Sequence, residues 1–436
     1  MTQNASVKRE QWLVLGAALL GWMFDGVEMG LFPIAARPAL QDLLKDTTAS
    51  EADVLRWISY LTALFLIGAA CGGILFGWLG DRMGRVRTMA LSIFAYSLFT
   101  GACYFATDPW QLGVFRFLAA LGMGGEWSLG VALVMECWPE KLRPLMAGII
   151  GAAGNVGYLL VALLAIQFRV TPESWRWIML ACTAPAVLAL LVLLVLPESK
   201  RWKQSVQKSG VKPMREVLTT RLAWPTVLAT AFASVALIGT WAGVTGFLPS
   251  WADKLAPDNP HAKGFVQVMV SIGAIIGCFF SPLVGGRFGR RPTYFGLCLF
   301  SLLACGCLFR GLTEYNAAFL SMALIAGCAT ASFYGWLPLY LPELFPTRVR
   351  ATGQGLSYNF GRVFAAAGVL MLGQVDQLQQ YFGAARENSS QFLAWLTWTA
   401  ADTTYPRACA VLTLIYLVGM VLIWLAPETK GKPLPD

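Results

Sequence analysis

The sequence predicts an all-α membrane protein in which twelve transmembrane helices form two pseudo-symmetric bundles of six. Composition is the first observation behind this prediction. Of the 436 residues, 57% are hydrophobic and 13% are charged, whereas soluble domains carry about 25% charged residues. The second observation is a series of twelve apolar segments, each long enough to cross ~30 Å of hydrocarbon. The third is a set of motifs that recurs in the two halves of the chain.

The twelve apolar segments follow one another with mostly short polar connections. Each has the length and hydropathy of a membrane-spanning helix, and the third and ninth are the shortest. They lie at about 12–36, 54–80, 88–106, 110–137, 144–168, 175–196, 222–248, 264–285, 292–310, 314–341, 352–375 and 406–426.

The polar stretch 199–221 divides the chain into an N-terminal bundle (1–198) and a C-terminal bundle (222–436). Parallel six-helix repeats with a substrate site between them are a transporter architecture. The repeated motifs are the loops GWLGDRMGRVRT (Gly77–Thr88) and SPLVGGRFGRRPT (Ser281–Thr293), the pairs Glu136 with Arg143 and Glu343 with Arg350, and the endings PES (Pro197–Ser199) and PET (Pro427–Thr429).

Lysine and arginine indicate how the chain is oriented. If both termini are cytoplasmic, 21 of the 33 basic residues lie on the cytoplasmic side and 10 on the outer side, leaving Arg116 and Arg362 within the membrane. This bias follows the positive-inside rule. It predicts a multi-pass protein of the cell (inner or plasma) membrane. It also explains the net charge of +9 without a nucleic acid partner.

Several function classes are not supported by the residues present. The ten cysteines lie in or beside apolar segments, and His261 is the one histidine, so neither a disulfide framework nor a metal site is expected. We see no nucleotide-binding motif and no nucleophile–base pair, which argues against an ATP-driven pump and against an enzyme. We expect the polar segment 376–405 to be an ordered outer loop, with an interfacial amphipathic helix as the alternative.

The repeated motifs resemble those of the major facilitator superfamily, and the resemblance covers nearly the whole chain. It rests on the loop motif at Gly77–Arg87, on RFLAALGMGG at Arg116–Gly125, and on PESKRW and PETKG. Within the superfamily, four strings are most similar to the sialate and monocarboxylate (lactate):proton symporters. They are GWMFDGVEMGLF, GMGGEW, LPELFPTRVRATGQGLSYNFGR and PETKGKPLP. The second loop departs from the pattern, because Gly286 replaces the acidic residue that the first loop has at Asp81.

The resemblance implies a secondary active transporter that works by alternating access and needs no cofactor. We expect proton-coupled symport of a small organic anion, such as a monocarboxylate or an acidic sugar, by a monomer whose other partners are protons and the lipid bilayer. The alternatives are a transporter of a neutral sugar, an aromatic acid or an organic cation, and a receptor-like member that does not transport.

Charged residues inside predicted membrane segments are candidates for proton coupling, because such residues are costly unless they face a partner or water. Asp25 and Glu28 lie in segment 12–36, and Arg116 and Glu126 lie in segment 110–137. We expect Asp25 or Glu28 either to pair with Arg116 or to serve as the protonation site. Glu126 is a further candidate for that site. A static salt bridge is the alternative for each of them.

Arg362 lies near the middle of segment 352–375, with no acidic residue within one helical turn. A guanidinium group matches a carboxylate geometrically, so we expect Arg362 to bind an anionic substrate. The alternative is an ion pair with a carboxylate of another helix. Other candidate substrate-binding residues are Asn359, Tyr358, Asn155, Tyr158, Tyr334, Trp241 and Gln267.

A second group of charges is expected at the cytoplasmic helix ends. We interpret it as a clamp that holds this side of the transporter shut in one state and opens in the other. The alternative is that the basic residues only anchor the topology. The gating charges are Asp81, Arg82, Arg85, Glu136, Arg143, Arg290, Glu343 and Arg350.

Overall fold

The computed structural model describes residues 9–45, 50–168, 170–207, 213–219, 221–259, 261–372, 398–401 and 404–435. Within these ranges every regular element is a helix. Eleven helical segments are long and apolar enough to cross a membrane, and α16 is a further long helix packed among them. The predicted all-helical membrane fold is therefore confirmed. The predicted outer loop 376–405 lies largely outside the described residues.

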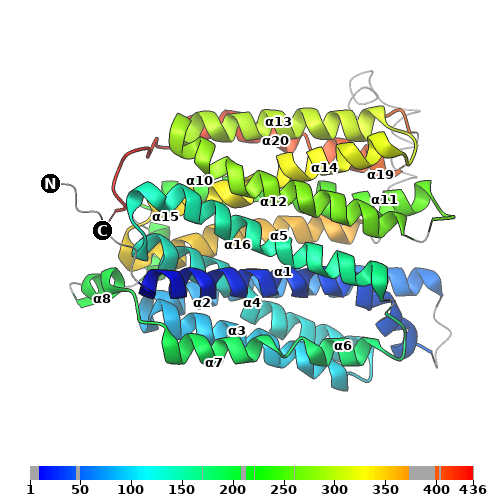
Figure 1. Ribbon diagram of the computed structural model, residues 1–436, viewed down its shortest axis with the longest axis horizontal. Helices are drawn as coiled ribbons and strands as arrows, with labels where there is room; N and C mark the ends of the chain where they lie inside the picture. Colours follow the sequence, from blue (N-terminus) through cyan, green and yellow to red (C-terminus); the bar gives the residue numbers. More distant parts are fainter. Residues whose placement is uncertain are drawn as a thin grey trace.

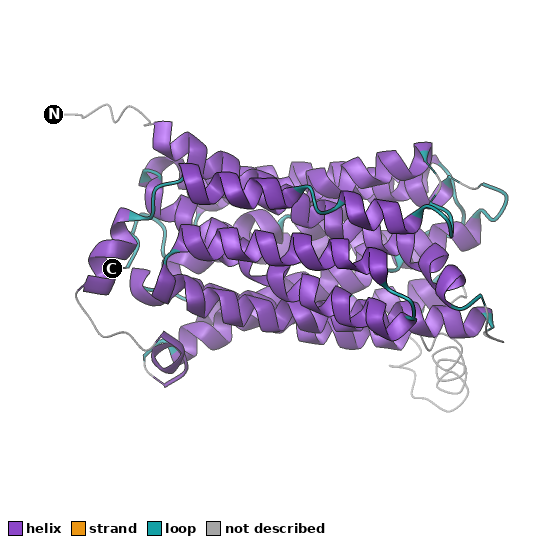
Figure 2. Cartoon of the chain, turned by 90° about the horizontal axis from the view of Figure 1, so that it is seen from below, coloured by secondary structure: helices purple, strands orange, loops and turns teal. Residues whose placement is uncertain are grey.

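The helices run roughly parallel along the long axis of the molecule (Figures 1 and 2). Before the linker, which we call the first half, they are α1 (Arg9–Leu43), α2 (Glu51–Met83), α3 (Arg85–Ala102), η1 (Cys103–Phe105), α4 (Pro109–Cys137), η2 (Glu140–Leu142), α5 (Arg143–Gln167), α6 (Trp175–Ala181) and α7 (Pro185–Val195).

The linker contains two short helices, and the helices after it form what we call the second half. The linker helices are α8 (Lys200–Gln207) and α9 (Pro213–Thr219). The second half contains α10 (Ala223–Leu237), the π-helical segment η3 (Ile238–Thr245), α11 (Leu248–Leu255), α12 (Ala262–Phe288), α13 (Arg290–Gly311), α14 (Ala317–Ala331), α15 (Phe333–Leu344), η4 (Thr347–Val349), α16 (Arg350–Leu372), α19 (Thr404–Leu412), α20 (Ile415–Leu422) and η5 (Ile423–Leu425).

Local sequence explains several helix boundaries. Ser50 begins α2 with a capping box in which its side chain and that of Asp53 bond each other's backbone N–H. Asp108 caps α4 ahead of Pro109. The segment predicted at 175–196 is two helices, because Pro185 lacks the N–H that a continuous helix would need and begins α7 instead.

The corresponding sharp turns in the two halves use glycine. Gly84 separates α2 from α3 with φ of 109°, and Gly289 separates α12 from α13 with φ of 104°. Positive φ is costly for residues with a Cβ atom, so the glycine in each repeated loop motif has a conformational role. The same turn therefore recurs at equivalent places in the two halves.

The two halves meet along two pairs of long helices. α2 packs against α16, and α5 packs against α12. The starts of α1 and α5 and the linker helix α8 all lie at one end of the bundle (Figure 1), which we call the linker end. At the opposite end the halves also touch, since Ala63 and Leu66 cluster with Ala365 and Ala366. The halves are thus in contact along much of the length of α2 and α16.

Candidate functional site

One group of buried charges in the first half lies at the linker end. Arg85 donates to Asp81 at 2.6 Å and to Glu136 at 3.3 Å, and it also donates to the Gly80 carbonyl at 2.7 Å. All three charged side chains are fully buried. Buried ionic groups are tolerated when several partners satisfy them, and each member of this group has more than one.

The same charges bond directly to the second half. Asp81 accepts from the backbone N–H of Thr352 at 2.7 Å, which places a carboxylate at the positive start of α16. Arg350 donates to Glu136 at 3.1 Å, and Arg85 donates to the Thr347 carbonyl at 2.7 Å. We call this set the latch; its members are Asp81, Arg85, Glu136, Thr347, Arg350 and Thr352.

The equivalent charges of the second half bond within that half. Arg290 donates to Glu343 at 2.5 Å and to the Gly285 carbonyl at 2.8 Å, which repeats the arrangement around Arg85. Gly286 stands at the position equivalent to Asp81 and faces Pro144 near the start of α5, so no carboxylate from this position crosses the interface. Because the second loop motif lacks this acidic residue, only the first loop motif contributes a carboxylate to the contacts between the halves.

The PET motif caps the second half at this end. Glu428 accepts hydrogen bonds from the backbone N–H groups of Arg290 at 3.0 Å, Arg291 at 3.1 Å and Lys430 at 3.0 Å. Partial burial opposes ionisation, but these backbone hydrogen bonds prevail and hold the pKa of Glu428 below its usual range. The stabilisation from this cap is therefore present at neutral pH and is lost only as the pH falls into the acid range. Glu198 of the PES motif caps α3 through Arg85 N–H at 2.9 Å.

Two predicted gating residues lie outside these ion pairs. Arg82 is exposed, and its guanidinium lies 4.5 Å from the ring centre of Trp78. Arg143 is buried and donates to the Met135 carbonyl at 3.2 Å. The structure therefore brings Asp81, Arg85, Glu136 and Arg350 together across the halves, and Arg290 with Glu343 within one half.

Replacing Asp81 with asparagine should open the linker end. Breaking a buried ion pair by removing one charge costs about 3–5 kcal/mol, and 3 kcal/mol changes a two-state ratio by roughly 150-fold. The measurement is the distance between spin labels at Met83→Cys and Phe288→Cys, which are exposed at this end on opposite halves. We expect a longer distance to become the main population.

Glu343→Gln is the matched control for this prediction, because it breaks a buried ion pair that lies within one half. We expect a much smaller change in the same label distance. If Asp81→Asn and Glu343→Gln shifted the distance equally, the latch would not be what holds the halves together.

The four charged residues predicted to take part in proton coupling form two neighbouring groups. Arg116 of α4 forms a buried ion pair with Glu28 of α1. Its guanidinium also lies 4.3 Å from the ring centre of Phe32 and 4.4 Å from that of Phe65. Of the two carboxylates predicted as partners of Arg116, the structure therefore places Glu28 against it. For Glu28, this geometry is that of a static salt bridge, which was the alternative to a role in proton coupling.

Asp25 and Glu126 form the second group. Asp25 is 0% exposed and Glu126 is 2% exposed. The carboxyl groups of Asp25 and Glu126 are each other's hydrogen-bonding neighbour, and no donor group of another described residue bonds either of them. The two carboxyl groups interact electrostatically. Glu126 also packs so closely on Gly21 of α1 that a Cβ atom at Gly21 would overlap the Glu126 carboxylate. Two adjacent carboxyls in an apolar site without such partners cannot both carry a charge cheaply.

Arg362 is buried near the middle of α16, with 2% of its surface exposed. It donates to the Asn359 side-chain oxygen at 2.8 Å, and its guanidinium lies 5.3 Å from the ring centre of Tyr358. Within the described residues no acidic group lies within ion-pair distance of it, although Asp25 is an electrostatic neighbour. Arg362 is therefore neither directed at lipid nor engaged in a close ion pair.

Asn359 positions this arginine. Its amide nitrogen donates to the carbonyls of Gly355 at 2.9 Å and Gly124 at 3.3 Å, and the second bond crosses from α16 to α4. Asn359 is fully buried and lines neither of the two cavities described below. It orients the guanidinium and joins the halves near the middle of the bundle.

One cavity lies next to Tyr358 between the halves, and we call it the aromatic cavity. Its walls come from α1, α5, α15 and α16, and Tyr358 stacks on Trp127 with ring centres 3.9 Å apart. The hydroxyl of Tyr334 is buried and interacts with the side chains of Thr240 and Arg362. The lining residues are Trp22, Gly26, Met29, Gly151, Gly154, Asn155, Tyr158, Tyr334 and Tyr358.

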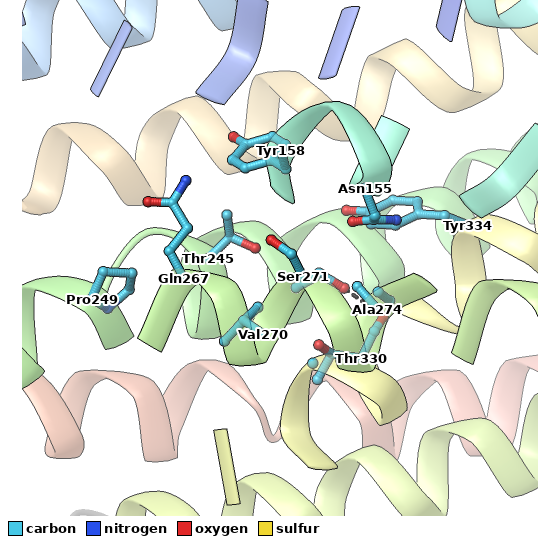
Figure 3. Close-up of a pocket in the computed structure, with 13 residues that line it drawn as sticks. Asn155, Tyr158, Thr245, Pro249, Gln267, Val270, Ser271, Ala274, Thr330 and Tyr334 are labelled. Atoms are coloured by element: carbon cyan, nitrogen blue, oxygen red, sulfur yellow. Dashed lines mark hydrogen bonds between the residues drawn. The ribbon is translucent and has the colours of Figure 1, made fainter. Parts of the chain in front are cut away.

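A second cavity continues from the first into the second half, and we call it the polar cavity. It shares Asn155, Tyr158 and Tyr334 with the aromatic cavity. Gln267 lies at the Pro249 side of the cavity, whereas Asn155 and Tyr334 lie at the other side (Figure 3). The remaining lining residues are Thr240, Thr245, Val270, Ser271, Ala274, Gly327, Thr330 and Ala331.

Most candidate substrate-binding residues thus line one of these two adjoining cavities, whereas Arg362 and Asn359 line neither. Tyr358, Asn155, Tyr158, Tyr334 and Gln267 are wall residues, whereas the side chain of Trp241 lies outside the described part of the structure. Sequence reasoning missed Ser271 and Thr245 as wall residues. Ser271 follows Gln267 by one helical turn, so the helical repeat along α12 could have identified it.

Comparisons with known proteins agree with this geometry. The model of the Major Facilitator Superfamily matches residues 13–369. A putative metabolite transport protein of Haemophilus influenzae is 28% identical over 97% of this chain and 98% of its own length. The cis,cis-muconate transport protein of Acinetobacter baylyi is 28% identical over 82% of this chain and 85% of its own. The structure of the proton:xylose symporter XylE has a TM-score of 0.75, with 17% identity, over 98% of both chains.

Proposed function

This chain belongs to the major facilitator superfamily, and we propose that it is a proton-coupled symporter of a small organic anion. It is a multi-pass membrane transporter rather than an enzyme. The observation that carries the proposal is Arg362, a buried guanidinium with no acid within ion-pair distance in the described residues, next to a cavity between the halves. The relative that transports cis,cis-muconate, an organic anion, supports the same substrate class.

The carboxylate of the substrate binds between Arg362 and the hydroxyl of Tyr334. Both groups are buried and interact electrostatically, and Thr240 is the hydrogen-bonding side chain beside the Tyr334 hydroxyl. A carboxylate accepts from both and supplies the missing counter-charge. Asn359 holds the guanidinium at 2.8 Å so that it is already oriented when the substrate arrives.

The Asp25–Glu126 pair carries the proton. Both carboxyls are buried and have only each other as a hydrogen-bonding side chain among the described residues, whereas Glu28 is neutralised by Arg116. Asp25 is also an electrostatic neighbour of Arg362. An anion bound at Arg362 weakens the attraction between the arginine and Asp25, so substrate and proton bind together. XylE, which has the same fold, is itself a proton symporter.

Alternating access follows from rocking of the halves about this site. The latch closes the linker end, which we assign to the cytoplasm from the distribution of basic residues. Opening of the latch releases substrate on that side. A single chain contains both walls of the cavity, so we propose that the monomer is the working unit.

The test is uptake by purified protein in liposomes under an inward proton gradient. Labelled cis,cis-muconate, benzoate, lactate and glucuronate represent acids, while xylose and choline represent neutral and cationic substrates. We expect at least one acid to accumulate above its outside concentration and xylose and choline to be excluded. Accumulation of xylose or choline without any acid would refute the proposal.

A further inference from the structure

Tyr96 of α3 is a buried residue that belongs neither to the latch nor to the walls of the two cavities. It is 1% exposed, and its hydroxyl has no hydrogen-bond partner in the described part of the chain. A buried hydroxyl without a partner costs free energy, so such a group needs an explanation. The packing around Tyr96 shows which group can satisfy it.

The close contact between α3 and α4 positions this tyrosine. A Cβ atom on Gly122 of α4 would lie only 2.5 Å from the backbone nitrogen of Tyr96, so the two backbones touch here. One turn away along α3, the Ser92 hydroxyl donates to the Gly122 carbonyl at 2.5 Å and holds the same contact. The backbone of Tyr96 therefore lies beside Gly122, which is one helical turn from Glu126.

The direction of the Tyr96 side chain brings its hydroxyl toward Glu126. The helix α3 begins at the latch and α4 ends there, so the two helices are antiparallel. Side chains lean toward the start of their own helix, so Tyr96 leans along α4 from Gly122 toward Glu126, about 6 Å farther on. In agreement, Glu126 is the charged group that interacts most strongly with the Tyr96 hydroxyl, and Asp25 is the next.

The Asp25–Glu126 pair needs an additional donor in only one of its protonation states. A hydrogen bond between two carboxyl groups requires a proton on one of them, because an ionised carboxylate only accepts. Once that proton leaves, the two carboxylates repel each other in an apolar site. Asp25 then has Arg362 as its electrostatic partner, whereas Glu126 has the hydroxyl of Tyr96.

We propose that Tyr96 is the hydrogen-bond donor that receives the Glu126 carboxylate when the Asp25–Glu126 pair has lost its proton. Tyr96 is thus a positioning residue, which stabilises the proton-free state of the transporter and eases release of the proton. The inference rests on the proposed function and deepens it, because it assigns a partner to the proton site after release. The other titratable or charged groups that interact with the pair or with Tyr96 are Glu28, Cys182, Tyr358 and Arg362.

The test is a pH titration of the pair in the purified full-length protein, followed by the infrared absorption of protonated carboxyl groups. The proton is the probe, and loss of the signal in Asp25→Asn and Glu126→Gln assigns it to the pair. Without the donor the ionised pair is less stable, so we expect Tyr96→Phe to move the titration midpoint to higher pH by about one to two units, the range of one hydrogen bond to a charged group. An unchanged midpoint, or the absence of a titrating signal in the wild-type protein, would overturn the inference.

The substitution separates the hydroxyl from the ring. Phenylalanine keeps the ring, so a role of Tyr96 in packing alone would leave the midpoint where it is. Tyr294→Phe is the matched control, because Tyr294 is a similarly buried tyrosine of α13 whose hydroxyl donates to the Phe232 carbonyl at 3.2 Å within the second half. We expect no shift in this control. A shift as large as that of Tyr96→Phe would overturn the assignment, because it could not come from contact with Glu126.

Melting temperatures provide a second measurement that needs no spectral assignment. Below the titration midpoint the Tyr96 hydroxyl has no partner, so Tyr96→Phe should be at least as stable as the wild-type protein. Above the midpoint the variant should be the less stable of the two, because it has lost the bond to the ionised carboxylate. A difference in melting temperature that does not change with pH would also overturn the inference. Both tests are independent of uptake, so a protein that transports no acid would refute the proposed function without deciding the role of Tyr96.

Discussion

Replacing Arg362 with alanine should abolish measurable uptake of the acid. The substrate carboxylate would then enter a buried site without its counter-charge, and an uncompensated buried charge costs about 3–5 kcal/mol. That cost corresponds to a loss of affinity of roughly 100- to 1000-fold or more. The measurement is the concentration dependence of uptake in liposomes, together with the melting temperature of the purified variant to show that it folds.

Arg362→Lys separates the shape of the guanidinium from its charge. Lysine keeps the charge but loses the planar fork, so we expect binding to weaken by about 10- to 100-fold. Arg176→Lys is the control, because Arg176 is held at the opposite end of the first half by the Tyr104 carbonyl at 2.8 Å and Asp42 at 3.0 Å. Wild-type affinity for the acid in Arg362→Lys would show that the guanidinium does not bind the substrate.

Neutralising the Asp25–Glu126 pair should uncouple transport from the proton gradient. We expect Asp25→Asn and Glu126→Gln to lose accumulation driven by a pH gradient, because neither amide can take up and release a proton. Exchange of labelled for unlabelled acid across the membrane needs no net proton movement, so it should persist. The measurement is the ratio of gradient-driven uptake to exchange, which we expect to fall by at least about 10-fold.

Glu28→Gln provides the contrast within the same helix. Glu28 is ion paired with Arg116, so its replacement should leave a buried arginine without its partner and lower the melting temperature. The protein that remains folded should keep its dependence on the pH gradient. If Glu28→Gln removed that dependence while Asp25→Asn and Glu126→Gln kept it, the proton would belong to the Arg116–Glu28 pair instead.

The repeat and the latch could be predicted because they depend on local signals. Charges and glycines recur at fixed spacings around the helix ends, and membrane-spanning length determines where those ends lie. The sequence shows that Gly286 lacks the carboxylate present at Asp81. It does not show which contacts between the halves are missing as a result. Only the packed structure shows that Asp81 meets the start of α16, whereas Gly286 meets Pro144 at the start of α5.

The membrane charges illustrate what the sequence leaves open. Asp25 and Glu28 are three residues apart on similar faces of α1, and depth along a helix does not decide which of them meets Arg116. The choice depends on close packing between helices, such as the contact of Glu126 on Gly21. These contacts assign Glu28 to Arg116 and leave Asp25 with Glu126.

The residues around the cavities also divide into those that could be predicted from the sequence and those that could not. Arg362 was predictable because a charge in an apolar segment is rare and needs a reason. Asn359 and Arg362 were both predicted to contact substrate; neither lines a cavity, and Asn359 holds the guanidinium beside Tyr358. Ser271 and Thr245 were missed because small hydroxyl residues occur on many membrane helices and often bond their own backbone. Their free hydroxyls become apparent only when α12 and η3 are placed around one space.

The central claim is that anion and proton enter together through Arg362 and the Asp25–Glu126 pair. The most direct measurement is the internal pH of liposomes containing the protein when the transported acid is added outside without any starting gradient. We expect the interior to acidify as the acid enters. In Arg362→Ala we expect neither entry of the acid nor a fall of the internal pH. Entry of the acid with no change of internal pH would contradict the account.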